Sequence, residues 1–80
     1  MKTPTDKNEV WMEVTSGPTK EGYYGFTFIW WAEGFHTGPC WRGQVFLSND
    51  PVAHKKKFET SGRKVIVKDY RLNRQEKLPI

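Results

Sequence analysis

The chain has 80 residues, with 13 Lys and Arg against 9 Asp and Glu, and a formal net charge of +4. This length gives one small domain and leaves no room for a second core. Cys40 is the only cysteine, which excludes a fold built on disulfides within the chain and favours a reducing compartment. The longest apolar run, at 28–32, is far shorter than the roughly 20 residues that span a bilayer, and no signal-peptide pattern is present. We therefore expect a soluble cytoplasmic protein that does not contact a membrane.

Three strands are expected in the first part of the chain. Residues 1–8 are polar with one proline and predict a flexible arm. Alternating apolar and polar residues predict a first strand at about 9–15, and the loop that follows at 16–22 is rich in turn formers. Aromatic and branched residues predict a second strand at about 23–33 and a third at 40–47.

Helix signals follow the third strand. Asn49 or Asp50 can cap a helix N-terminus, and Pro51 suits the first turn. Gly62 is placed to end a helix in a left-handed conformation. Together these signals predict one short helix at about 51–60.

The remaining sequence completes a single domain. Strand composition returns at 63–71, and the polar residues at 73–80 predict a weakly ordered tail. Residues 9–72 therefore form the folded domain. The order of elements predicts an α+β fold, with a small, mostly antiparallel sheet of about four strands and one short helix between the third and fourth strands. A small β-barrel is the alternative.

Alternation divides each strand into two faces. We expect the more uniformly apolar set to face the core: Val10, Met12, Val14, Tyr24, Phe26, Phe28, Trp30, Ala32, Trp41, Val45, Leu47, Val65 and Val67. The helix would cover this set with Val52, Ala53 and Phe58. The opposite face has no second helix to cover it and would carry Trp11, Glu13, Tyr23, Thr27, Ile29, Trp31, Arg42, Gln44, Phe46, Lys64, Ile66, Lys68 and Tyr70. A register error of one residue would exchange the two faces.

The uncovered face combines aromatic rings with basic side chains, and positive charge gathers in the second half of the chain. Residues 41–80 hold ten basic and four acidic side chains, or +6. Rings stack on bases while Lys and Arg neutralise phosphates. We therefore expect binding to nucleic acid, to single strands more than to duplex, through Trp11, Tyr23, Trp31, Arg42, Lys64, Lys68, Tyr70 and Arg71. Secondary basic contacts are expected from Lys55, Lys56, Lys57, Arg63 and Arg74.

A protein partner is the alternative interpretation of the same face. Trp, Tyr and Arg dominate binding hot spots between proteins. The chain would then be a compact inhibitor or accessory factor of the kind that phages and mobile elements encode, or a homodimer. Packing of the outer aromatic side chains under the arm, the tail or the loop at 16–22 is a third interpretation.

The sequence contains no convincing catalytic or metal-binding pattern. His36 and Cys40 are four residues apart, a spacing that matches no strong zinc motif, and no third group is identified to orient a Cys–His pair. Neither of the common glycine-rich phosphate-binding motifs is present. We therefore expect a protein that is not an enzyme and that holds no metal and no cofactor.

Overall fold

A computed structural model describes residues 3–33, 38–72 and 78 of the chain. Four strands form one sheet in the order β3-β2-β1-β4, and their bounds are β1 (Glu9–Ser16), β2 (Tyr24–Ala32), β3 (Cys40–Ser48) and β4 (Lys64–Asp69). One helix, α1 (Pro51–Thr60), follows β3. The expected α+β fold is confirmed. The sheet is open, with β3 and β4 at its two edges, so the β-barrel alternative is wrong.

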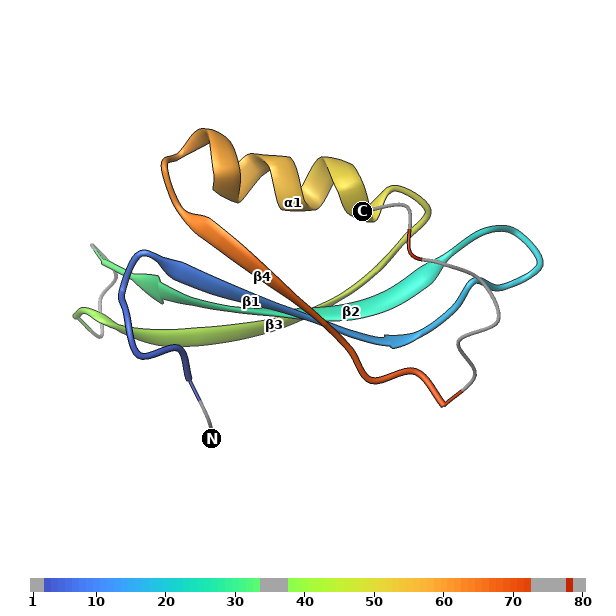
Figure 1. Cartoon of the computed structure of the whole chain (residues 1–80), viewed down its shortest axis with the longest axis horizontal. Coiled ribbons are helices and arrows are strands. Elements are labelled where there is room, and N and C mark those ends of the chain that lie inside the picture. Colours follow the sequence, from blue (N-terminus) through green and yellow to red (C-terminus); the bar gives the residue numbers. More distant parts are fainter. Residues whose placement is uncertain (1–2, 34–37, 73–77, 79–80) are drawn as a thin grey trace.

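The helix connects the two edges of the sheet and lies across one of its faces (Figure 1). The β1–β2 and β2–β3 pairs are antiparallel, whereas β4 pairs with β1 in parallel. Strands β3 and β4 therefore run in the same direction, and the chain needs a crossover between them. Helix α1 provides that crossover, and among the described residues no helix lies on the opposite face.

The ends of α1 follow the predicted signals. The Asp50 carboxylate accepts a hydrogen bond of 3.1 Å from the backbone N–H of Ala53, which makes Asp50 the N-cap. Pro51 occupies the first turn and is buried. Gly62 follows the C-cap residue Ser61 with a φ of +87°, a conformation that glycine adopts without steric cost.

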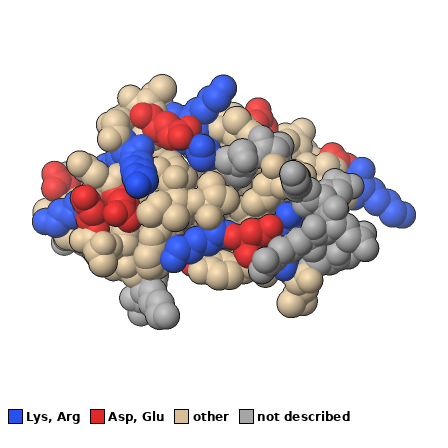
Figure 2. Space-filling model, viewed as in Figure 1, with Lys and Arg blue, Asp and Glu red and all other residues tan. Residues whose placement is uncertain are grey.

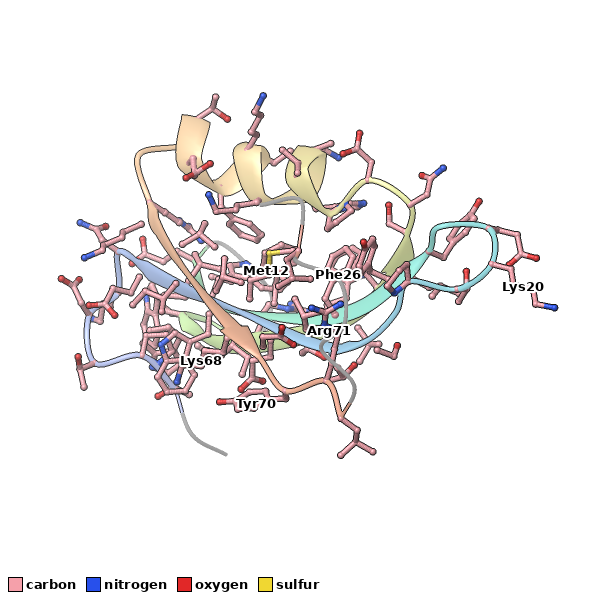
Figure 3. The ribbon with its side chains drawn as sticks, turned by 45° about the vertical axis from the view of Figure 1, so that its right-hand side comes forward. Met12, Lys20, Phe26, Lys68, Tyr70 and Arg71 are labelled. Carbon is pink, nitrogen blue, oxygen red and sulfur yellow. The ribbon has the colours of Figure 1, made fainter. Side chains whose placement is uncertain are left out.

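The core lies between the sheet and α1, where Figure 3 shows Met12 and Phe26. Its fully buried members were all predicted and are Val10, Met12, Val14, Phe26 and Phe28. The ring of Phe28 lies 4.8 Å from that of Phe58, which brings α1 onto β2. Ala53 was expected to help cover this face, but it is exposed. His54 packs there instead, 5.0 Å from the ring of Phe46, because residues 54 and 58 share one side of a helix.

The predicted faces of the third strand are wrong. Strand β3 pairs Phe46 with Phe26 and Arg42 with Trp30, and cross-strand partners lie on the same face of a sheet. The side facing α1 therefore carries Arg42, Gln44 and Phe46, and the opposite side carries Trp41, Val45 and Leu47. The two sets were exchanged because both contain large apolar side chains, so alternation alone does not identify the buried set.

The segments flanking the domain make specific contacts with it. Pro4 is buried, and the backbone N–H of Lys64 donates a 2.8 Å hydrogen bond to the carbonyl of Asn8. Leu78 packs against the core cluster, whereas the rest of the predicted tail, 73–77 and 79–80, lies outside the described residues. No helix in the described part of the chain is long and apolar enough to cross a membrane.

Candidate functional site

The candidate site is the face of the sheet opposite α1, which we call the open face. Figure 3 shows Lys68 and Tyr70 on this side of the sheet, away from Met12 and Phe26. The pairing registers, and Figure 3 for Tyr70, assign the following residues to it: Glu9, Trp11, Glu13, Gly25, Thr27, Ile29, Trp31, Trp41, Gly43, Val45, Leu47, Lys64, Ile66, Lys68 and Tyr70. It therefore retains most of the residues that the sequence placed there.

Tryptophan side chains form an apolar layer over one part of the open face. Trp11 lies in register between Ile29 of β2 and Ile66 of β4. Trp31 packs edge-on against its register partner Trp41, with ring centroids 5.4 Å apart. Ile29 is only 5% exposed although no helix covers it. Neighbouring side chains on the same face therefore bury this part of the sheet.

Two of the tryptophans already have cationic partners within the chain. The Nζ atom of Lys68 lies 3.4 Å from the ring centroid of Trp11, and that of Lys7 lies 4.6 Å from the ring centroid of Trp31. Contacts of this kind contribute about 0.5–1 kcal/mol at exposed sites. The indole Nε1 of Trp31 also donates a 3.0 Å hydrogen bond to Glu33. Both rings that were expected to stack on bases are thus half-buried and engaged.

Positive charge on the open face is balanced by acidic neighbours. In the parallel pairing of β1 with β4, Lys64 lies opposite Glu9 and Lys68 lies opposite Glu13. Opposite charges across neighbouring strands attract each other and reduce the potential that either presents to a ligand. Figure 2 likewise shows acidic and basic side chains interspersed on the visible side of the molecule.

The two arginines expected on the open face lie elsewhere. Arg42 is on the side facing α1. Arg71 is 4% exposed, and its Nε and Nη2 donate hydrogen bonds of 2.9 Å each to the Asp69 carboxylate. Its Nη1 donates a third, of 3.1 Å, to the carbonyl of Gly17. Arg71 therefore connects the end of β4 to the loop after β1 and does not present a free charge to solvent.

The predicted secondary basic residues do not join the open face. Lys55 forms a 3.0 Å ion pair with Glu59 on α1. Lys56 and Lys57 are exposed on the same helix, on the other side of the sheet from Lys64 and Lys68. Arg63 is half-buried before β4, and Arg74 lies outside the described residues. The helix and strand lysines consequently form no single basic stripe.

The most exposed apolar side chains lie toward one end of the strands, spread across the sheet from the β3 edge to the β4 edge. We call this group the apolar end; its members are Tyr23, Val45, Leu47, Tyr70 and Leu72. Val45 and Leu47 are 76% and 69% exposed, and their register partners are Thr27 and Gly25. At the same end, the backbone N–H of Tyr70 donates to the carbonyl of Val14. Tyr23 and Tyr70 were predicted as contacts, whereas Val45 and Leu47 were missed because they had been assigned to the core.

The residues that the structure describes offer no alternative site built on metal chemistry. In the parts of the chain that it describes, no three His, Cys, Asp or Glu side chains come close enough to hold a metal ion. Cys40 is half-buried at the start of β3, and His36 lies outside the described residues. No protein-family model matches the chain, and no curated protein or solved structure is significantly similar to it. The open face therefore remains the candidate functional site.

Proposed function

We propose that this chain is a non-enzymatic protein-binding module that docks a partner on the apolar end of the open face. The observation that carries the proposal is the strong exposure of Val45 and Leu47 on edge strand β3, with Tyr70 exposed after β4 at the other edge of the same face, a face on which the described residues place no helix. Large apolar side chains that are exposed together mark interaction surfaces. An inhibitor or accessory factor would be a protein of this kind.

Energetics and charge both favour a protein over a polyanion. Full burial of a Val or Leu side chain contributes about 1.5–3 kcal/mol, and tyrosines are frequent hot-spot residues. The lysines of β4 lie opposite glutamates, and Arg71 is buried against Asp69. A partner that supplies apolar area therefore gains more from this surface than one that supplies phosphates.

Single-stranded nucleic acid is the second candidate, favoured by the proximity of Lys68 to the Trp11 ring. A base could replace the ammonium group on the ring while Lys68 moves to a phosphate. Tryptophan fluorescence during titration with a mixed-sequence oligonucleotide tests this. Saturable quenching that weakens steeply with salt would support it. A tryptophan emission spectrum that the oligonucleotide leaves unchanged at low salt would exclude this second candidate.

The protein-binding proposal is tested with a paired set of variants. The double variant Leu47→Ser, Tyr70→Ser removes apolar area from the open face, and the control Lys56→Ser, Lys57→Ser changes two exposed positions on α1. Each is immobilised and used to capture proteins from a lysate of the native cells. We expect a protein that the wild type and the control retain and the open-face variant loses. The purified partner should bind with the same pattern; equal retention by all three would contradict the proposal.

A further inference from the structure

Strand β3 lies at an edge of the sheet, and its sequence does not protect that edge. Within the described ranges no strand lies beyond it, so no strand there pairs with its outer backbone groups. Natural edge strands are usually short, charged, interrupted by proline or bulged. Strand β3 has nine residues, Arg42 as its only charge, no proline, and an unbroken register with β2. Strand β4 at the opposite edge has six residues, three of them charged.

We propose that β3 pairs with β3 of a second copy of this chain, antiparallel and around a two-fold axis. Two four-stranded sheets would then join into one of eight strands, with both helices on the same side. Full overlap of the nine-residue strands places the axis at Gln44. The proposal concerns the edge of β3 and does not depend on the docking of another protein on the open face.

The register with full overlap is self-complementary. On the open face, Leu47 lies opposite Trp41 of the second copy, and Val45 lies opposite Gly43, which has no side chain to obstruct it. Residues directly opposite in an antiparallel pair are about 4.5–5.5 Å apart, so the strongly exposed Leu47 gains a tryptophan neighbour, and Val45 meets no steric obstruction.

Electrostatics also permits this register. Arg42 lies opposite Phe46 of the second copy, and the two copies of Arg42 are four residues apart along the strand direction. Four residues correspond to about 13 Å, which exceeds the Debye length of about 8 Å at physiological ionic strength. The net charge of +4 on each copy opposes association, so added salt should strengthen it.

The small size of the contact predicts a weak dimer that forms only as the protein concentration rises. Nine residues extend about 30 Å, and pairing of two such edges about 10 Å thick buries about 600 Å² in total. This is below the about 1,200 Å² that is typical of stable complexes. We therefore expect the dimer to form between about 10 µM and 1 mM.

Sedimentation velocity of the wild-type chain and three variants tests the proposal. The wild type should shift from 9.4 kDa toward twice that mass as its concentration rises. Gln44→Lys and Gln44→Glu each place like charges opposite each other at the axis and should each weaken association by at least about tenfold. An equimolar mixture of the two should restore the dimer, because opposite charges then meet. Asn49→Lys adds the same charge at an exposed position just beyond β3 and should associate like the wild type.

Two results would overturn the proposal. If the wild-type chain remains at 9.4 kDa up to about 1 mM in physiological salt, it does not self-associate through the β3 edge. Dimers that both Gln44 variants leave unchanged form through another surface. Circular dichroism establishes that each variant is folded. Capture by the open face is a separate readout, so its failure and the failure of edge pairing are distinguishable.

Discussion

Replacing Arg71 with methionine should destabilise the fold even though the sequence alone placed Arg71 in a binding site. The substitution removes three hydrogen bonds from a buried guanidinium, two to Asp69 and one to Gly17. Breaking a buried ion pair costs about 3–5 kcal/mol. The Asp69 side chain keeps 24% exposure and can recover some hydration, so we expect a loss of about 3 kcal/mol, at the lower end of that range.

Thermal unfolding followed by circular dichroism measures this loss. A chain of 80 residues has an unfolding entropy of about 0.17 kcal/mol/K, so 3 kcal/mol corresponds to a fall in Tm of about 18 °C. Arg63→Met is the matched control because Arg63 is half-buried and only its backbone N–H takes part in a described hydrogen bond. It should change the stability by less than about 0.5 kcal/mol. Equal Tm values for the two variants would refute the structural role of Arg71.

Three further substitutions test the core, the helix cap and the first loop. Phe28→Ala removes a fully buried ring that contacts three other phenylalanines, and we expect a loss of about 3–5 kcal/mol and of the cooperative thermal transition. Asp50→Ala removes the cap of α1 and should cost about 1 kcal/mol in urea unfolding, whereas Asn49→Ala should leave the midpoint unchanged. Gly17→Ala should cost at least about 2 kcal/mol, because its φ is +107° and the new Cβ would lie 2.7 Å from the Tyr23 carbonyl oxygen. Gly22→Ala, with a φ of +83° and no atom nearby, should cost only about 1 kcal/mol, and similar melting curves for the two would contradict this difference.

The sequence predicted the elements of this fold better than their arrangement. The helix was placed correctly because Asp50, Pro51 and Gly62 are local signals whose effect does not depend on distant contacts. The parallel position of β4 beside β1 depends on where the crossover ends, and no local residue pattern specifies this. Which strands pair, and in which register, depends on contacts between residues that are far apart in the sequence. The two faces of β3 were exchanged for the same reason.

The same limit applies to the candidate site. Tyr23 and Tyr70 were expected on the uncovered side because strand alternation separates them from the apolar set, and both are exposed in the structure. Val45 and Leu47 resemble core residues until Phe46 is seen to pack on Phe26. Arg71 follows the last strand and resembles a surface charge, because the partners that bury it include a backbone carbonyl 54 residues away in the sequence, that of Gly17.

The most direct test of the account is to locate the surface that a captured partner contacts. Amide chemical shifts of the isotope-labelled chain are recorded while the purified partner is added. Docking on the apolar end should change the shifts of open-face residues, most around Val45, Leu47 and Tyr70, and leave those of Lys56 and Lys57 on α1 nearly unchanged. Changes that centre on the exposed side of α1 and leave the apolar end unaffected would contradict it.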